Sequence, residues 1–203
     1  MKLTYYGHAC FTLEHEGFRA VLDPFDDHVP GYPVPVQQAE AVYCSHGHGD
    51  HAYTRAVTLT GSGENPFAVT EVETDHDDCG GAKRGKNTVR VLEAGGIRVC
   101  HLGDLGHMPT PEQIGAMGRV DLLLVPVGGF YTIGPETANA VCAALGAKAV
   151  VPMHYRRGCQ GFDVIADVED FLALRTDVVR AGTNTLELTG DLAGTILLDA
   201  PEK

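Results

Sequence analysis

The stretch Ser45-His46-Gly47-His48-Gly49-Asp50-His51 decides how the rest of this 203-residue sequence is interpreted. It follows an apolar segment, residues 41–44, that is expected to form a strand. Three histidines and one aspartate stand within six residues, and imidazole and carboxylate groups are ligands of zinc-like ions. Chance histidines in a polar loop explain this spacing poorly, so the stretch predicts a metal site.

The geometry of this stretch favours two ions over one. In an extended chain His46 and His48 point to the same face, because side chains alternate with a period of two. The intervening glycines allow a sharp turn, which would bring Asp50 and His51 in from another direction. Two pairs of ligands with different orientations suit two ions held a few ångströms apart.

The segments around this stretch predict an α/β fold. Pro135 opens a helix that Gly146 closes, and residues 168–174 are expected to form a second, short helix. These patterns predict an αββα sandwich, two mixed β-sheets flanked by helices, in a single domain over residues 1–203. Strands are expected at residues 2–6, 10–14, 18–22, 41–44, 67–72, 88–93, 97–100, 120–127, 148–152, 185–188 and 195–198.

Composition limits the partners and the location of the chain. Its net charge of −12 disfavours nucleic-acid backbones and anionic membranes as partners, so no nucleic acid and no membrane are expected. The first residues lack the apolar run of a signal peptide, and no stretch approaches the length of a transmembrane helix. The six cysteines contain no C-x-x-C pair. A cytoplasmic location with reduced thiols is the expectation.

The histidine-rich stretch resembles the signature of the metallo-β-lactamase superfamily. That resemblance implies a third histidine for the first ion, an aspartate that bridges both ions and a last histidine for the second ion. His76, Asp104 and His154 match these places, since each lies at the end of a predicted strand. The implied ligand sets are His46, His48 and His76 for the first ion, Asp50, His51 and His154 for the second, and Asp104 as the bridge.

Within the superfamily, the chain looks most like the branch of predicted zinc-dependent hydrolases that includes ascorbate-6-phosphate lactonase-like proteins. His48 stands where diiron relatives of the fold have a glutamate, which favours a hydrolytic metal. Asp104 stands where the lactamases proper commonly have a cysteine, which argues against antibiotic hydrolysis. The stretches that carry this resemblance are Tyr6-Gly7-His8, Leu22-Asp23-Pro24-Phe25, His76-Asp77-Asp78, residues 101–107, Pro126-Val127-Gly128-Gly129 and Met153-His154-Tyr155.

The function implied is that of a dinuclear metal-dependent hydrolase. Two divalent ions are expected, Zn²⁺ in preference to Mn²⁺ or Fe²⁺, both of which a mixed nitrogen and oxygen ligand set also accepts. A metal-bridging hydroxide would cleave a small, anionic ester, lactone or phosphoester, with Asp50 and Asp104 as catalytic residues. The alternative is a mononuclear-iron oxidoreductase of the thiol-persulfide dioxygenase type on the same fold. A small-molecule substrate is the expected partner, and a homo-oligomer is compatible with the resemblance.

Several further residues are candidates for substrate contacts or supporting roles. His8, His107, Arg156 and Arg157 are candidates for binding the substrate, the two arginines through a phosphate or carboxylate. The Pro-rich residues 29–36 are expected to form a wall of the cleft. Asp23 is expected to hydrogen-bond a ligand, His101 to be structural, and Cys79 to compete weakly as a ligand.

Overall fold

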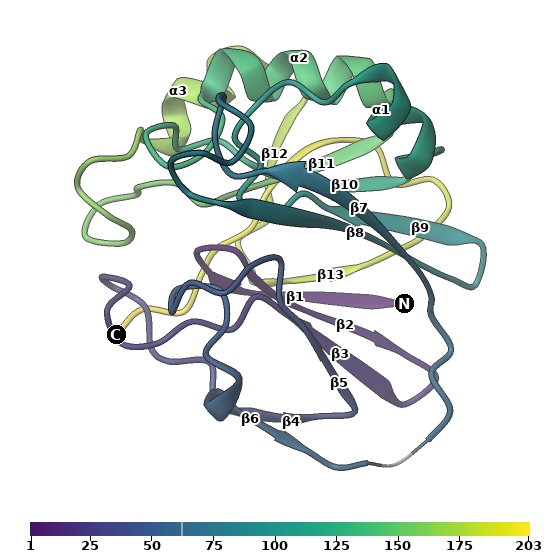
Figure 1. Cartoon of the computed structure of the whole chain (residues 1–203). Helices are drawn as coiled ribbons and strands as arrows, with labels where there is room; N and C mark the ends of the chain where they lie inside the picture. Colours follow the sequence, from purple (N-terminus) through teal and green to yellow (C-terminus); the bar gives the residue numbers. More distant parts are fainter. Residues whose placement is uncertain (62) are drawn as a thin grey trace.

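The computed structural model describes residues 1–61 and 63–203 and contains two mixed β-sheets packed face to face (Figure 1). Both sheets combine parallel and antiparallel strands, as predicted. The elements in chain order are β1 (Lys2–Gly7), β2 (Cys10–His15), β3 (Phe18–Leu22), β4 (Gln37–Ala39), β5 (Ala41–Tyr43), η1 (Thr54–Ala56), β6 (Val57–Leu59), β7 (Ala68–Asp75), β8 (Lys86–Ala94), β9 (Ile97–His101), α1 (Pro111–Met117), β10 (Leu122–Pro126), α2 (Pro135–Leu145), β11 (Ala149–Met153), α3 (Val168–Leu172), β12 (Val178–Arg180), β13 (Thr185–Glu187) and β14 (Gly194–Leu197).

The smaller sheet has the order β13-β1-β2-β3-β5 among the described residues. Its neighbours pair antiparallel except for β3 and β5, which are parallel. The β1–β2 connection is tight, because His8 lies two residues before β2 begins and takes a positive φ of 53°. The turn that carries His8 lies close to the histidine-rich stretch, which follows β5. The smaller sheet therefore contributes candidate metal donors from two of its connections.

The larger sheet has the order β12-β14-β11-β10-β9-β8-β7. Strands β12 to β9 run parallel to one another, and β9, β8 and β7 form an antiparallel meander. A turn at Gly95-Gly96 joins β8 to β9, and both glycines have positive φ, as a type I′ hairpin turn requires. All five residues of β10 and all five of β11 are buried, which confirms a strand covered on both faces.

The helices cover one sheet only. In Figure 1, α1, α2 and α3 lie together above the larger sheet, on the side away from the smaller one. Helix α1 begins with a capping box between Thr110 and Gln113, and the Gln113 side chain also donates to the Glu73 carbonyl of β7. The outer face of the smaller sheet is instead covered by the short β4–β6 pair and by apolar side chains that include Val21, Phe25 and Tyr32.

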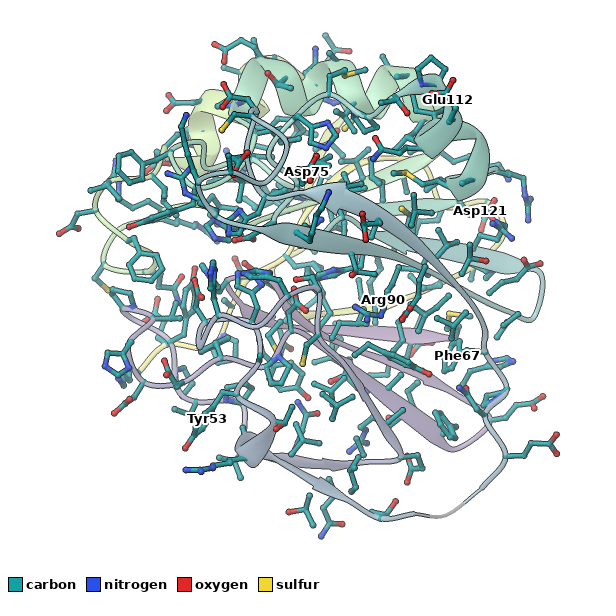
Figure 2. All side chains as sticks on the ribbon, in the orientation of Figure 1. Tyr53, Phe67, Asp75, Arg90, Glu112 and Asp121 are labelled. Atoms are coloured by element: carbon teal, nitrogen blue, oxygen red, sulfur yellow. The ribbon has the colours of Figure 1, made fainter. Side chains whose placement is uncertain are left out.

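The sheets are joined by an apolar core and by Arg90. Figure 2 shows Arg90 reaching from β8 into the space between the sheets, where its guanidinium donates to the Cys44 carbonyl beyond β5. The same guanidinium lies 5.7 Å from the Tyr43 ring and pairs with Glu71 at 3.0 Å. Among the described residues, no helix is both long and apolar enough to cross a membrane.

The predicted fold class is confirmed; the α-helices cover only the larger sheet, and the other differences concern short elements. The sequence patterns missed α1, β4, β6 and β12. The three strands have three residues each, too few for a periodic pattern to be distinguished from chance. The Pro-rich residues 29–36 do not form the expected wall of the cleft: Val29 and Tyr32 are buried in the apolar cluster outside the smaller sheet.

Candidate metal centre

The histidine-rich stretch begins directly after β5 and bends immediately. The backbone N–H groups of His51 and Ala52 both donate to the His48 carbonyl, so the chain folds back instead of staying extended. The backbone already bends over residues 45–48, so the expected extended arrangement of His46 and His48 is not observed, yet their rings lie 4.6 Å apart and perpendicular to each other. The turn expected from the two glycines is present, and Asp50 and His51 face the cluster from a different side than His46 and His48 do.

The predicted ligands gather into overlapping groups of donor atoms that lie within 4.8 Å of one another. Each group draws on residues far apart in the sequence. The groups are His46, His48 and His76; His8, Asp50, His51 and His154; and His46, His51 and Asp104.

Asp104 lies between the first two groups. Its Oδ1 atom is 3.2 Å from Nε2 of His51, and its Oδ2 atom is 3.3 Å from Nε2 of His76 and 3.4 Å from Nε2 of His154. One carboxylate therefore faces nitrogens that the sequence had divided between two ions. This is the position that a bridging ligand requires.

Several buried nitrogen and oxygen atoms of the cluster have no hydrogen-bond partner, and bound divalent metal ions would account for them. Buried polar groups are nearly always hydrogen-bonded, so orphaned ones need an explanation. Nε2 of His46 and His51, both ring nitrogens of His154 and Oδ1 of Asp104 are buried without a hydrogen-bond partner. Imidazole nitrogens and carboxylate oxygens converging in this way match the ligand chemistry of zinc.

The protonation states of the histidines differ across the cluster. Burial, together with the nearby His51, lowers the pKa of His46 to about 4. Burial and His154 lower the pKa of His8 to about 3. Burial opposes the charge of Asp104, but His154 and His51 outweigh it and hold the pKa of this carboxyl well below its usual range. His51 is shifted the other way: burial opposes its charge, but Asp104 and Asp23 outweigh burial and hold the pKa of His51 well above its usual value. His51 must therefore release a proton before it binds a cation, whereas His46 and His8 are neutral at pH 7, the form that binds a metal ion.

Asp23 holds His51 in place from behind. Its Oδ2 atom lies 2.8 Å from Nδ1 of His51, and its two oxygens accept hydrogen bonds of 2.6 Å from the backbone N–H and the hydroxyl of Ser45. Asp23 was expected to hydrogen-bond a metal ligand, and it makes this contact with His51, whose Nε2 atom then faces the cluster. His101 is structural, as expected: its ring bonds the Ala9 carbonyl and the Gly103 N–H.

Two glycines let the Asp104 loop approach the other donor segments. A Cβ on Gly103 would lie 2.4 Å from atoms of Asn87 and Ser45, and one on Gly106 would lie 2.2 Å from the Asp77 nitrogen. The Asn87 amide oxygen also accepts from the Asp104 N–H at 2.9 Å. Close contact therefore fixes the Asp104 carboxylate against the segment that follows β5 and against the turn that follows His76.

The turn after His76 is held by the Asp77 carboxylate. Its oxygens accept backbone N–H bonds of 2.8–2.9 Å from Cys79, Gly81, Lys83 and Arg84. The His76 N–H donates to the Gly85 carbonyl at 3.0 Å and closes the turn. Cys79 is exposed in this turn and belongs to none of the donor groups.

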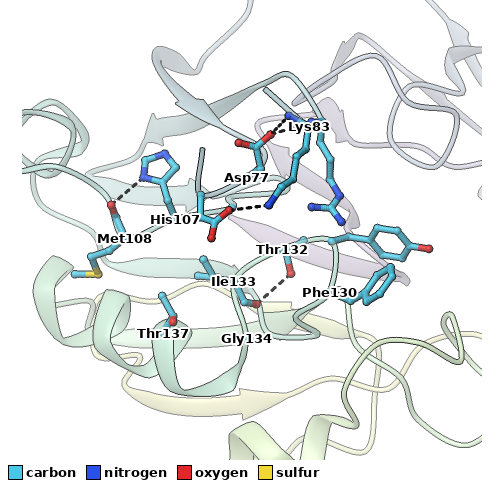
Figure 3. Close-up of a pocket in the computed structure, with 13 residues that line it drawn as sticks. Asp77, Lys83, His107, Met108, Phe130, Thr132, Ile133, Gly134 and Thr137 are labelled. Atoms are coloured by element: carbon cyan, nitrogen blue, oxygen red, sulfur yellow. Dashed lines mark hydrogen bonds and ion pairs between the residues drawn. The ribbon is translucent and has the colours of Figure 1, made fainter. Parts of the chain in front are cut away.

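A cleft opens above the cluster. A cavity of about 490 Å³ is lined by His48, Asp50, His76 and Asp104 together with residues that do not belong to the donor groups. These further residues are Asp26, His28, Gly49, Arg84, Tyr131 and Phe162. A second cavity of about 750 Å³ adjoins it, and Arg84 and Tyr131 line both (Figure 3).

The four residues expected to bind substrate do not line the cavity over the cluster. His8 is fully buried, with Nε2 3.4 Å from Oδ2 of Asp50, so it supports that carboxylate instead of facing substrate. His107 lines the second cavity and bonds the Met108 carbonyl (Figure 3). Arg156 pairs with Asp167 at 3.7 Å and Arg157 with Asp199 at 2.8 Å, which holds both guanidinium groups elsewhere.

The arginine that does line the cleft is Arg84. Sequence reasoning missed it because it lies eight residues after His76, on a turn whose shape depends on the Asp77 carboxylate. The basic run Lys83-Arg84 between a ligand and a strand was the available signal.

The fold and the histidine–aspartate cluster define a class, the metallo-hydrolases of the metallo-β-lactamase fold. The profile of the Beta-lactamase superfamily domain matches residues 2–154, three quarters of the chain, and the chain belongs to that superfamily. More narrowly, it is 30% identical to a UPF0173 metal-dependent hydrolase of Archaeoglobus fulgidus, over 84% of this chain and 89% of the relative. A UPF0173 metal-dependent hydrolase of Korarchaeum cryptofilum is 27% identical, over 77% and 83% of the two chains.

Solved structures agree with this placement. A Thermotoga maritima protein assigned to the zinc-dependent hydrolases of the superfamily superposes with a TM-score of 0.78 at 39% identity, covering 98% of this chain and 99% of its own. Igni18, a metallo hydrolase of Ignicoccus hospitalis, shares the fold at a TM-score of 0.66 and 21% identity, over 100% and 96% of the two chains. The protein is thus a metal-dependent hydrolase of this superfamily. The narrower resemblance to ascorbate-6-phosphate lactonase-like proteins stays a prediction.

Proposed function

We propose that this protein hydrolyses a small anionic ester, lactone or phosphoester with two divalent ions, zinc in preference to manganese or iron. The observation that carries the proposal is the position of Asp104, whose carboxylate lies 3.2–3.4 Å from histidines of both donor groups. A single-ion site would leave the second group, with its buried orphaned nitrogens, without a role.

Each donor group would hold one ion. His46, His48 and His76 would bind the first, Asp50, His51 and His154 the second, and Asp104 both. Ions bound there would supply a hydroxide nucleophile at neutral pH, since they lower the pKa of water towards about 7, and would polarise the substrate oxygen. Imidazole and carboxylate donors without a thiolate suit Zn²⁺ and leave Mn²⁺ and Fe²⁺ as competitors.

Asp50 would move the proton in this mechanism, and three observations support that role. It lines the cleft, its side chain is 26% exposed, and its Oδ2 atom lies 3.4 Å from Nε2 of His8. Burial disfavours its charge, but the bond from His8 and the nearby His51 hold the pKa of Asp50 well below its usual range. An ionised carboxylate at the cleft surface can take the proton of the attacking water and pass it to the leaving group.

The cleft favours a small molecule. A cavity of about 490 Å³ is of the size that holds a small ligand, and apolar rings of Tyr131 and Phe162 line it beside the polar donors. Binding of small molecules, the absence of nucleic-acid and membrane partners, a cytoplasmic location, a single domain and any homo-oligomer all stay predictions.

Metal content and activity test the proposal together. Protein purified without chelator is analysed for metals, stripped, reloaded with zinc, manganese or iron, and assayed on a panel of lactones, esters and phosphodiesters. Two ions per chain, with hydrolysis lost on stripping and restored on reloading, are expected. One iron per chain without hydrolysis would refute the two-metal hydrolase and favour the thiol-persulfide dioxygenase alternative.

An Asp50→Asn variant separates the proposed roles of the carboxylates. It should still fill the first site and keep substrate affinity, yet lose most of kcat, because the amide cannot accept the proton. Asp50 is also a proposed ligand of the second ion, so metal content is measured alongside activity: loss of kcat with two ions retained assigns the proton transfer to Asp50, and loss of the second ion assigns the effect to metal binding. Asp26→Asn is the matched control, since Asp26 also lines the cavity but belongs to neither donor group around Asp104.

A further inference from the structure

Arg84 stands at the boundary of the two cavities, beside the donor cluster. The cavity of about 490 Å³ contains Arg84 together with His76 and Asp104, and the cavity of about 750 Å³ contains it together with Phe130 and Tyr131. A molecule that occupies both cavities must pass this guanidinium. Its charge therefore acts on whatever extends from the metal centre into the second cavity.

The guanidinium is left without a carboxylate partner. Across residues 1–61 and 63–203 it forms no ion pair, whereas its neighbour Lys83 pairs with Asp78 at 3.4 Å. It lies instead 5.9 Å from the centre of the Phe130 ring and 5.7 Å from that of Tyr131. A guanidinium that packs against aromatic rings can keep its N–H groups free for a planar or tetrahedral oxyanion. In a chain of net charge −12, such a cation in a cleft is the group that would attract an anionic substrate.

The backbone holds this arginine rigidly relative to the metal centre. The Asp77 carboxylate accepts the Arg84 N–H at 2.8 Å, and the His76 N–H donates to the Gly85 carbonyl at 3.0 Å. One closed turn thus carries a metal donor at its start and the cation at its end. Fixed spacing between a reacting centre and a charged group is what selection of a substrate by length and charge requires.

The aromatic wall is kept in a strained backbone. Phe130 has a positive φ of 55°, which is unfavourable for a residue with a Cβ, and its side chain is 62% exposed. Such strain persists where the surrounding structure over-determines it, and it concentrates at binding sites. Tyr131 continues the wall inward, with its ring 6.4 Å from that of His154. The rings therefore lead from the donor cluster to the mouth of the cleft.

We propose that Arg84, Phe130 and Tyr131 form a recognition site for a carboxylate or phosphate carried on an apolar or planar part of the substrate. Arg84 binds the oxyanion and the two rings cover the body of the molecule. The inference rests on the proposed hydrolase function only in placing the scissile bond over the metal centre. Arg84 is thus a specificity-determining residue.

Binding without turnover tests this site independently of catalysis. The zinc-loaded protein is titrated calorimetrically with benzoate, phenylphosphonate and the neutral isostere benzamide. The wild-type protein should bind at least one of the two anions roughly tenfold more tightly than benzamide, through the charge-assisted bonds of Arg84. Comparison of the two acids shows which oxyanion the site accepts. A wild-type protein that shows no such preference, or no binding, overturns the proposal.

Variants separate Arg84 from the metal ions, which also attract anions. Arg84→Gln should abolish the preference, Arg84→Lys should retain only part of it, and Arg157→Gln should leave it unchanged, since Arg157 is paired with Asp199 away from the cleft. Phe130→Ala should weaken binding of all three probes by about two- to tenfold. A preference that survives in Arg84→Gln would assign it to the metal ions and refute the proposal, even if hydrolysis and metal content behave as proposed.

Discussion

Replacement of Asp23 by asparagine tests how the metal centre is supported from behind. Asp23 is 1% exposed, and its carboxylate accepts from the backbone N–H and hydroxyl of Ser45 and lies 2.8 Å from Nδ1 of His51. A carboxylate only accepts hydrogen bonds, so it requires the proton of His51 to be on Nδ1. The lone pair of Nε2 is then directed at Asp104 and free for a metal ion.

Asparagine reverses this arrangement without changing the volume. Its amide oxygen must stay with the Ser45 N–H, so its NH₂ group replaces the oxygen that faces His51. Nδ1 of His51 must then accept, and the proton moves to Nε2, where it blocks metal coordination. Loss of such a support typically lowers metal affinity 10- to 100-fold, equivalent to about 1.4–2.8 kcal/mol.

Zinc affinity is measured by competition with a chromogenic chelator and fitted with two sites. In Asp23→Asn the weaker site should lose about 10- to 100-fold in affinity, and the other site should change less. Asp121→Asn is the control, because Asp121 also holds three partners, Arg98, Arg119 and Lys148, but lies just before β10, at the end of the larger sheet away from the cluster (Figure 2). An Asp23→Asn affinity within about twofold of wild type, or an equal loss in the control, would refute the tautomer argument.

Three further outcomes are expected. Gly103→Ala should lower the free energy of unfolding in urea by roughly 1–3 kcal/mol more than Gly182→Ala does. Both glycines have positive φ, but only at Gly103 would a Cβ lie 2.4 Å from neighbouring atoms. Equal losses in the two variants would contradict the close packing of the Asp104 loop. Burial lowers the pKa of His101, so the unfolded chain binds the proton first and stability falls as pH drops below about 6.5; His101→Gln should reduce this slope by up to about 1.4 kcal/mol per pH unit, and the exposed His28→Gln should not. For each ion bound, zinc at 100 times its Kd should raise Tm by roughly 5–10 °C over the stripped protein in a thermal melt, and an unchanged Tm would indicate that no native metal site exists.

The sequence was most informative where ligands are close together along the chain. The spacing of the residues from His46 to His51 predicted a metal site by itself. His76, Asp104 and His154 were predicted as further ligands from the family signature and from their places at strand ends. The structure brings all of these donors together. Residues that are close together along the chain stay close in the folded protein, so such a motif can be recognised from the sequence alone.

Charged residues outside the motif were interpreted less well. Arg156 and Arg157 looked like an anion clamp because they are adjacent, but Asp167 and Asp199 neutralise them from segments 11 and 42 residues away. Arg84 looked unremarkable and lines the cleft. Whether a cation is paired depends on tertiary contacts, which single-sequence patterns do not contain. Helix α1 is different, since the capping-box pattern of Thr110 and Gln113 was present and simply not used.

The donor residues come from both sheets, and this has a consequence for the order of events in folding. His8 and residues 46–51 follow strands of the smaller sheet, whereas His76, Asp104 and His154 follow strands of the larger one. The second ion would therefore act as a non-covalent cross-link that closes a loop of more than 100 residues, from His51 to His154. The last donor emerges from the ribosome only after three quarters of the chain has been made. The second ion therefore cannot guide the early docking of the sheets; it can only lock an assembly that the apolar core has already formed.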